Sequence, residues 1–524
     1  MRMNILFIMC DQLRADYLSC YGHPHIATKN IDSLASRGLQ FNNAYCQAPL
    51  CGPSRASFYT GRYMSSHGVM ANSDPLKLGE LTLGDYLRQI DMPAIVVGKS
   101  EGSPNQVAID RFDIDIDSAR GKCLANNGFS PYERFSGIYP DALVPDDLGY
   151  SAHLRSHGFN GGNPWEAWAN TAIDSAGRKV SGWYMQNAGL PARIPEEYSE
   201  TAFITDRAVE FLRSVDVEDS WCMHLSYIKP HWPYLAPTPY HNIYRTDHVL
   251  KAIRHESERF HAHPVYKAFM NLDYSKNFSR DEVRNTVIPT YMGLIQQIDN
   301  HIGRVLIELK KHGLHEKTVI VFSSDHGDYL GDHWLGEKDL FHRQSFRIPL
   351  IIYDPSRAAD LSRGRVVEEF VEAIDILPTL VELAGGASSE ERVEGRSLVP
   401  FLRETKPSWT RESVFSEIDY SDRGARASLG LHPYDCRARA IQTSRWKYIL
   451  HERFRPQLFD LDNDPDEFID LGQDPGYASV RQDCYDQLFT WYRNLKVRTE
   501  VPTEFLFKMG PDRDEQRGIL IGRW

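Results

Sequence analysis

The sequence has no long hydrophobic run, no excess of basic residues and no regular spacing of cysteines. No apolar stretch in its 524 residues approaches the roughly 20 residues that cross a bilayer, so we expect no membrane-spanning segment. The net charge of −12 argues against a nucleic-acid-binding protein. The eight cysteines are scattered, which fits a reducing cytoplasm better than a disulfide-rich fold. The run MRMNILFIMCDQ is predicted to be the first core strand, because its apolar stretch is too short for a signal peptide and ends at Asp11.

Short apolar runs alternate with helical patterns along the chain. The predicted strands are Ile5–Cys10, Ala94–Val97, Cys222–Leu225, Val319–Phe322 and Leu350–Tyr353. Continuous apolar strands of this kind suit a sheet that is covered on both faces. The strongest helical pattern spans Pro289–Lys311, with apolar residues at helical spacing and Gly313 after its end. The alternation predicts an α/β sandwich around a largely parallel sheet.

The character of the sequence changes near residue 390. Segments 413–419, 445–450 and 457–461 are typical of short antiparallel strands, and a helix is expected at 477–495. We therefore predict a catalytic α/β domain at 1–390 and a smaller domain at 391–498. The remaining segment, 499–524, is expected to form an arm that contacts another subunit, because it carries several apolar residues without a core of its own.

Cys51 opens the run CGPSRASFYTGR, the most informative feature of the chain. Pro is favoured in the first turn of a helix, so Pro53 predicts a helix over 53–60. The free N–H groups of such a helix would point back at residue 51 and favour an anion there. Arg55 adds a fixed positive charge with several donors.

Ligand-type residues follow two predicted strands. Asp11 and Gln12 end the first strand, and Asp325 and His326 follow the strand that precedes the run SSDHGD. In open α/β sheets, ligands bind at the carboxyl ends of the strands. The two pairs can therefore meet around one cation.

These motifs together resemble the sulfatase branch of the alkaline phosphatase superfamily, close to the arylsulfatases and the phosphonate monoester hydrolases. The Cys51 run is similar to the site at which sulfatases convert cysteine to formylglycine. The resemblance covers nearly the whole chain and includes the C-terminal signature from Trp446 to Leu471. It implies an alkaline-phosphatase-like sandwich around a mostly parallel central sheet, with a smaller C-terminal α+β subdomain.

The resemblance also implies one divalent metal ion, held by Asp11, Gln12, Asp325, His326 and the modified Cys51. Sulfatases usually carry a second Asp in place of Gln12 and an Asn in place of His326, whereas Gln and His at these places resemble the phosphonate monoester hydrolases. Ca²⁺ prefers oxygen ligands, and an imidazole suits borderline metals. We therefore favour Mn²⁺, with Ca²⁺ as the alternative.

The same resemblance assigns residues to the substrate. It implies that Asn72, Lys99, His231 and Lys338 bind the ester, with His231, alone or with Lys338, acting on the leaving alcohol. Sulfatases carry a His where this chain has Glu101. Glu101 could be the base that releases the product, or it could pair with Lys99 or Arg55.

The function implied is hydrolysis of sulfate monoesters of the arylsulfatase type, through a covalent sulfo-enzyme hemiacetal on formylglycine. Lys99 favours this reading, while Gln12 and His326 favour the alternative, a phosphonate monoester hydrolase or phosphodiesterase with the same nucleophile. The net site charge suits any monoanion, so promiscuity is expected. If Cys51 stays a thiol, a non-catalytic metal-binding protein is a further alternative. The expected partners are a small sulfate ester, a formylglycine-generating enzyme and further copies of the chain in a dimer or tetramer, but no nucleic acid or membrane.

Overall fold

The computed structural model of the chain describes residues 3–72, 74–138, 148–404 and 407–498, with the single positions 505, 507 and 518. Within this part, nine strands form a central sheet in the order β10-β2-β9-β8-β1-β7-β3-β4, with β11 beside β2. The strands are β1 Asn4–Asp11, β2 Leu39–Tyr45, β3 Ala94–Gly98, β4 Ser130–Arg134, β7 Cys222–Pro230, β8 Thr318–Ser324, β9 Arg347–Tyr353, β10 Arg365–Val367 and β11 Val371–Glu372. β9 runs antiparallel to β2 and β8, and the other neighbouring pairs are parallel. The predicted α/β fold with a mostly parallel sheet is confirmed.

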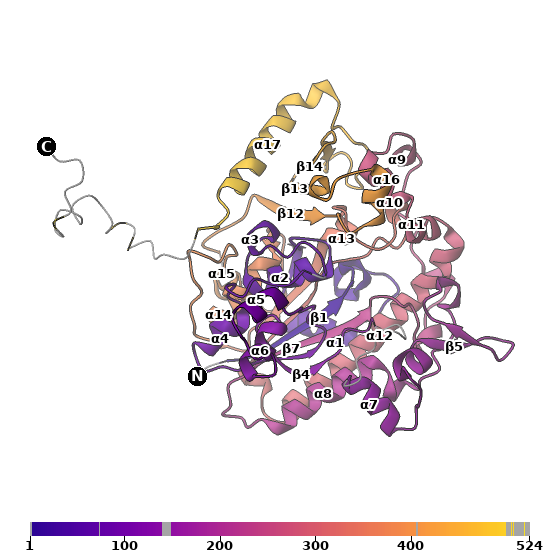
Figure 1. Cartoon of the computed structure of the whole chain (residues 1–524), viewed down its shortest axis with the longest axis vertical. Coiled ribbons are helices and arrows are strands. Elements are labelled where there is room, and N and C mark those ends of the chain that lie inside the picture. The colour runs from indigo at the N-terminus through magenta and orange to yellow at the C-terminus, as the bar shows by residue number, and fades with distance from the viewer. Residues whose placement is uncertain are drawn as a thin grey trace.

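Helices cover both faces of this sheet, and Figure 1 shows α8 and α12 on one side with α4 and α14 on the other. Those of the central domain are α1 Lys29–Arg37, α2 Cys51–Thr60, α3 Met64–His67, α4 Leu83–Arg88, α5 Gln106–Arg111, α6 Ala119–Ala125, α7 Gly149–Ser156, α8 Glu200–Ser214, α12 Asp281–Lys311, α13 Arg343–Phe346, α14 Ile376–Leu383 and α15 Val399–Arg403. Successive side chains of β1 serve different cores. Leu6 and Ile8 pack with α1, α8 and α12, whereas Phe7 and Met9 pack with α2, α4 and α14. This alternation explains why the whole strand is apolar.

The longest helix differs from the sequence prediction at its start. α12 begins at Asp281 rather than at Pro289, and Pro289 lies inside it. Proline usually ends or bends a helix because it lacks the N–H donor. Here the helix continues because Val287, Ile288 and Tyr291 on either side of Pro289 are buried in the core.

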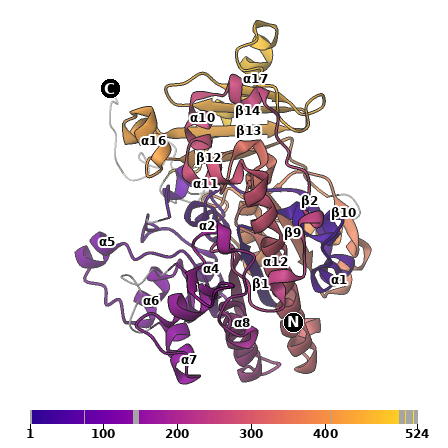
Figure 2. The same cartoon turned by 90° about the vertical axis from the view of Figure 1, so that its right-hand side faces the viewer.

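The C-terminal part forms a second sheet, which lies above the central layers in Figure 2. It consists of β12 Ser413–Asp419, β13 Arg437–Thr443, β14 Trp446–His451 and β15 Gln457–Asp460, all antiparallel. β13 was not predicted from the sequence. Helix α17, Ala478–Arg493, packs on this sheet through Cys484 and Leu488. The domain boundary at residue 390 stays a prediction, and the predicted arm at 499–524 lies outside the described residues apart from three single positions.

Several short elements complete the described chain. They are α9 Ser257–Phe260, α10 Pro264–Met270, α11 Asp273–Phe278, α16 Gly424–Leu429 and a small hairpin of β5 Thr171–Ile173 and β6 Lys179–Ser181. Of the helices in the described ranges, none is long and apolar enough to cross a membrane.

Candidate active site

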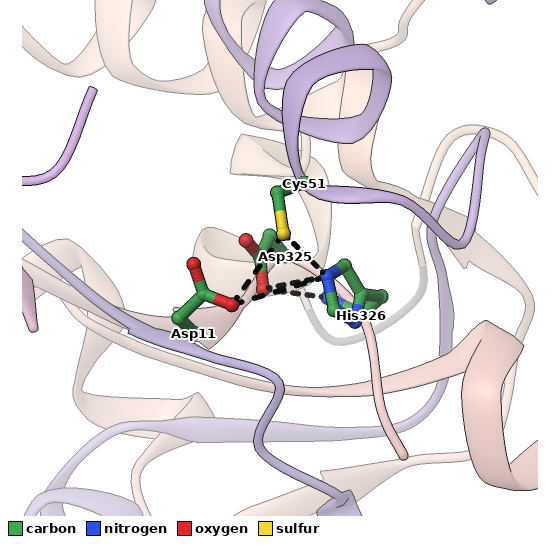
Figure 3. A group of neighbouring side chains, drawn as sticks. All are labelled: Asp11, Cys51, Asp325 and His326. Carbon is green, nitrogen blue, oxygen red and sulfur yellow. Dashed lines mark hydrogen bonds and ion pairs between the residues drawn. The ribbon is translucent and has the colours of Figure 1, made fainter. Parts of the chain in front are cut away.

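Four ligand-type side chains from distant parts of the chain meet at the carboxyl end of the central sheet (Figure 3). Strands β1 and β8 are parallel neighbours, and their register places Cys10 opposite Ser324. Asp11 and Asp325 follow these two positions directly, so the sheet itself brings them together. The backbone N–H of Gln12 donates to Asp325 Oδ1 at 3.0 Å, which ties the two strand ends to each other.

Cys51 completes this group from the first turn of α2. Ligand atoms of Asp11, Cys51, Asp325 and His326 all lie within 4.8 Å of one another, and all four residues are buried. Cys51 Sγ is 3.1 Å from His326 Nε2 and 3.6 Å from Asp11 Oδ1.

The donor set of this cluster fits a divalent cation. His326 Nδ1 donates to the carbonyl of Gly327 at 2.9 Å, which leaves the lone pair of Nε2 facing the cluster. Burial, followed by the charge of Lys338, lowers the pKa of His326, so the imidazole is neutral and able to act as a ligand. Two buried carboxylates and one imidazole provide the charge and the lone pairs that such an ion requires.

Arg55 holds both carboxylates in place. Its guanidinium is fully buried and lies 2.8 Å from Asp325 Oδ2 and 3.1 Å from Asp11 Oδ2. The remaining donors reach the Lys99 carbonyl and the Ser226 hydroxyl, each at 2.8 Å. This planar fork orients the two acids more firmly than a lysine could.

Lys99 is engaged by two acids. Its ammonium lies 2.6 Å from Asp11 Oδ2 and 2.6 Å from Glu101 Oε1. Of the alternatives that the sequence left open for Glu101, the structure contains the pair with Lys99. Burial alone would raise the pKa of Asp11, but Lys99 and the other nearby cations hold it well below its ordinary value.

The Lys338 ammonium contacts Cys51, Gln12 and His231. The Lys338 ammonium is 3.2 Å from Cys51 Sγ, 3.0 Å from Gln12 Oε1 and 3.1 Å from His231 Nε2. His231 Nδ1 donates to the Trp232 carbonyl at 2.7 Å, so Nε2 accepts from Lys338. Burial and the charge of Lys338 lower the pKa of His231 well below its ordinary value, and the proton therefore belongs to the lysine.

The start of helix α2 differs from the prediction. The helix begins at Cys51 rather than at residue 53, so residue 51 lies within its first turn. Its next N–H groups are occupied: Gly52 donates to Asn72 Oδ1 at 2.8 Å, and Ser54 donates to the Leu50 carbonyl at 2.9 Å. Pro53 has no N–H, so α2 does not present the row of free donors that the sequence suggested. The amide oxygen of Asn72 thus accepts a hydrogen bond from the first turn of α2, which leaves the NH₂ group as the other polar end of this side chain.

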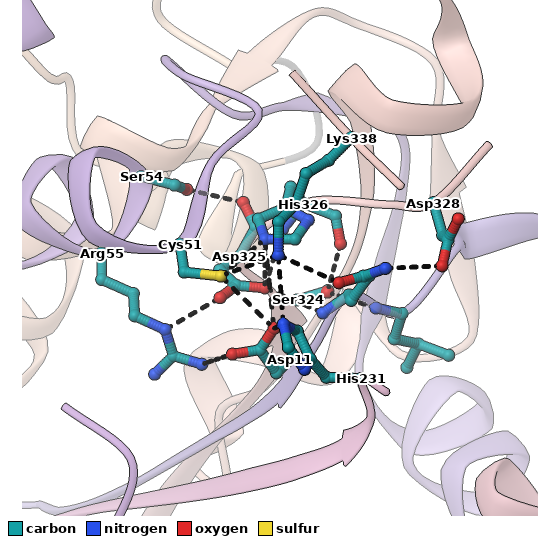
Figure 4. Close-up of polar contacts among 12 residues, drawn as sticks. Asp11, Cys51, Ser54, Arg55, His231, Ser324, Asp325, His326, Asp328 and Lys338 are labelled. Atoms are coloured by element: carbon teal, nitrogen blue, oxygen red, sulfur yellow. Dashed lines mark hydrogen bonds and ion pairs between the residues drawn. The ribbon is translucent and has the colours of Figure 1, made fainter. Parts of the chain in front are cut away.

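One residue of this region, Asp328, was missed by the sequence analysis. Asp328, labelled in Figure 4, is buried. It accepts from Gln12 Nε2 at 2.6 Å and from Tyr234 Oη at 2.6 Å. The available signal was its place in the run SSDHGD, three residues after Asp325. Burial raises the pKa of Asp328 and acts against the donors of Tyr234 and Gln12, which lower it.

Comparisons with known proteins agree with this geometry. The family model described as Sulfatase matches residues 3–387, and the model described as N-sulphoglucosamine sulphohydrolase, C-terminal, matches residues 331–494. A relative from Trinickia caryophylli, the multifunctional alkaline phosphatase superfamily protein PehA, is 33% identical over 95% of this chain and 96% of its own length. The arylsulfatase of Clostridium perfringens is 26% identical over 95% of this chain and 94% of its own length.

Among solved structures, the phosphonate monoester hydrolase of Silicibacter pomeroyi superposes with a TM-score of 0.81 at 28% identity, covering 94% of this chain and 96% of that one. The corresponding enzyme of Agrobacterium radiobacter gives a TM-score of 0.80 at 27% identity, with the same coverage. The family match spans more than half of the sequence and includes the elements that carry Asp11, Cys51, Asp325 and His326. The chain therefore belongs to the sulfatase family of hydrolases, within the alkaline phosphatase superfamily.

Proposed function

We propose that the protein hydrolyses sulfate monoesters of the arylsulfatase type with formylglycine at position 51 and a divalent metal ion. One observation carries this proposal. Cys51 lies in one buried cluster with the carboxylates of Asp11 and Asp325, and its Sγ is 3.2 Å from the ammonium of Lys338. A nucleophile placed in this way has a cation site and a proton donor within reach.

Two groups supply the central chemistry when they are bound or formed. A divalent cation held by Asp11, Gln12, Asp325 and His326 would supply Lewis acidity at the reacting oxygens. Formylglycine would supply a geminal diol, that is, a nucleophilic hydroxyl and a second hydroxyl that can later expel sulfate.

The side chains around position 51 have separate tasks in the proposal. Arg55 orients the carboxylates of Asp11 and Asp325 towards the cation site. The Lys338 ammonium donates its proton to the departing alcohol oxygen, and the neutral ring of His231 holds the ammonium in place. This assignment revises the predicted order of the two residues, because His231 accepts from Lys338 and has no proton to give at Nε2.

Lys99 and Glu101 are assigned to the sulfuryl oxygens and to product release. The Lys99 ammonium would neutralise charge that develops on the sulfuryl oxygens. Glu101 has a side chain exposed by 15%, whereas Lys99 is fully buried. Glu101 can therefore take the proton of the second formylglycine hydroxyl and pass it to solvent, and release of sulfate requires this proton transfer.

A second candidate function is hydrolysis of phosphonate monoesters or phosphodiesters. Gln12 and His326 in the cluster favour it, as do PehA and the two phosphonate monoester hydrolases among the similar proteins. Lys99 opposes it. All three ester classes are monoanions, so we expect one dominant activity with weaker activity on the other two.

The test is a comparison of kcat/KM for 4-nitrophenyl sulfate, a 4-nitrophenyl phosphodiester and a 4-nitrophenyl phosphonate, with Mn²⁺, Ca²⁺ or Zn²⁺ added. Mass spectrometry of the peptide that contains Cys51 determines the modification in the same sample. We expect formylglycine and a preference for the sulfate. An unmodified thiol in fully active protein, or a dominant phosphonate activity, would contradict the proposal.

Maturation by a formylglycine-generating enzyme, a cytoplasmic location and a homo-oligomer formed through residues 499–524 belong to the same proposal. Conversion of the Cys51 thiol to an aldehyde is an oxidation, and the proposal assigns this step to the formylglycine-generating enzyme. Expression with and without such an enzyme, followed by mass spectrometry and light scattering, tests the maturation and the oligomer.

A further inference from the structure

Asp328 is a buried acid beside the cluster that the proposed reaction leaves without a role. Its side chain has no exposed surface, and both of its oxygens are used. Oδ2 accepts from Gln12 Nε2 and from Tyr234 Oη, each at 2.6 Å, and Oδ1 accepts from the Leu330 N–H at 3.0 Å. Asp328 therefore faces the amide of Gln12. Figure 4 shows Asp328 apart from Asp11, Cys51, Asp325 and His326.

The two ends of the Gln12 amide have chemically different partners. Oε1 lies 3.0 Å from the Lys338 ammonium, and Nε2 lies 2.6 Å from Asp328 Oδ2. An ammonium group only donates hydrogen bonds, so it requires the oxygen at its end. If the amide turned over, its NH₂ group would face the ammonium and its oxygen would face the acid. Both contacts would be lost together.

The backbone of Gln12 is fixed independently of its side chain. It has a φ of 62°, which an L-residue rarely adopts. Its N–H donates to Asp325 Oδ1 at 3.0 Å, and its carbonyl accepts from Tyr291 Oη at 2.8 Å. These contacts fix the backbone of Gln12, but they do not determine the orientation of its side-chain amide.

We propose that Asp328 is a positioning residue that keeps Gln12 Oε1 turned towards the metal site proposed at Asp11, Cys51, Asp325 and His326. By taking the NH₂ group of Gln12, it leaves the amide oxygen on the side of Lys338, whose ammonium is 3.2 Å from Cys51 Sγ. A carbonyl oxygen has a second lone pair in addition to the one that meets Lys338, and this pair is available to a cation. The inference rests on the proposed function, because it takes Gln12 as a ligand of the metal.

The first experiment measures the Kd for Mn²⁺ by isothermal titration calorimetry in wild-type protein and in Asp328→Asn. Asparagine keeps the size of the side chain but can present its own NH₂ to Gln12 Nε2. One of the two contacts that orient the Gln12 amide is then lost, and only the contact with the Lys338 ammonium remains. Loss of a residue that orients a metal ligand typically weakens metal binding by about 10- to 100-fold, and we expect a Kd increase in this range. Tyr234→Phe is the matched control. It removes the other donor to Asp328 Oδ2 but keeps the contact with Gln12, and it should change the Kd much less.

A second experiment separates positioning from a merely structural role. The double variant Gln12→Glu with Asp328→Asn reverses the donor and acceptor of the pair. A carboxylate at position 12 presents an oxygen whichever way it turns, so Mn²⁺ binding should return to at least the wild-type strength. This variant can be compared directly with the wild type even if Asp328→Asn alone does not fold.

Two results would overturn the inference. One is a Kd for Asp328→Asn equal to that of the wild type. The other is a double variant that binds Mn²⁺ as weakly as Asp328→Asn, which would show that Asp328 supports the local structure and not the amide of Gln12. Wild-type protein that binds no divalent metal would overturn the proposed function and this inference together.

Discussion

The ammonium of Lys99 lies 2.6 Å from the carboxylate oxygen of Asp11 that also accepts from Arg55 at 3.1 Å. Two cations thus share one buried oxygen of an acid that faces the metal cluster. Lys99 and the other nearby cations hold the pKa of Asp11 well below its ordinary value. In the proposed reaction, Lys99 also neutralises charge on the substrate oxygens. This makes Lys99 a sensitive probe of the substrate class.

Lys99→Ala should reduce hydrolysis of a sulfate monoester far more than hydrolysis of a phosphodiester. A sulfate monoester presents three non-bridging oxygens, and a phosphodiester presents only two, so the sulfate depends more on every positive group. Removal of one such group typically costs about 10²- to 10³-fold in rate, which is the loss expected for the sulfate. The measurement is kcat/KM for both substrates with the same leaving group. An equal loss for both would count against the assignment of Lys99.

Lys338→Ala should make kcat/KM depend more steeply on the pKa of the leaving alcohol. If Lys338 protonates the departing oxygen, alcohols of high pKa need it most. The loss of kcat/KM should approach the 10²- to 10⁴-fold that is typical of general acid catalysis for poor leaving groups and be small for good ones. A series of aryl sulfates with graded leaving groups tests this. A uniform loss across the series would mean that Lys338 only binds the substrate.

Arg55→Met should destabilise the metal-free protein strongly. The substitution leaves the buried carboxylates of Asp11 and Asp325 without their shared partner, and breaking a buried pair in this way typically costs about 3–5 kcal/mol. Urea unfolding in the presence of a chelator gives the free energy of unfolding. Arg245→Met is the matched control, because Arg245 and Asp247 form an exposed pair, and little or no change is expected there. Similar losses for both variants would be inconsistent with the role of Arg55.

His224→Gln should make the free energy of unfolding fall less steeply as the pH is lowered. Burial lowers the pKa of His224 to about 3, while the unfolded chain has a histidine pKa of about 6.5. Between these values, the unfolded state binds a proton that the folded state does not, so stability falls as the pH falls. One such group contributes about 1.4 kcal/mol per pH unit, or about 2 kcal/mol between pH 6.5 and pH 5.

The free energy of unfolding at several pH values between 7 and 5 measures this slope for the wild type and for His224→Gln. The variant also loses the contact between Tyr59 Oη and His224 Nε2 at 2.8 Å, which lowers its stability by the same amount at every pH. The test is therefore the difference between the two proteins in the slope of the free energy of unfolding against pH. Parallel curves for the two proteins would show that His224 is not the titrating group.

The sequence predicted the strands of the sheet and the family because both are encoded in short stretches of sequence. The apolar run at Ile5–Cys10 suits a strand covered on both faces, and the run that begins at Cys51 resembles the site of the sulfatases. The sequence also placed Asp11 and Asp325 correctly at strand ends. Predictions failed where local preference and tertiary packing disagree, as at Pro289 inside α12 and at the start of α2.

The residue types at the site and their places at strand ends were thus determined by the sequence alone. Only the tertiary structure decided which groups are partners: Lys99 with Asp11, Gly52 with Asn72, and Gln12 with Asp328. The physical reason is that hydrogen bonds and ion pairs depend on positions within a few tenths of an ångström. Gln12 and Asp328, separated by 316 positions in the chain, acquire those positions from the register of β1 on β8.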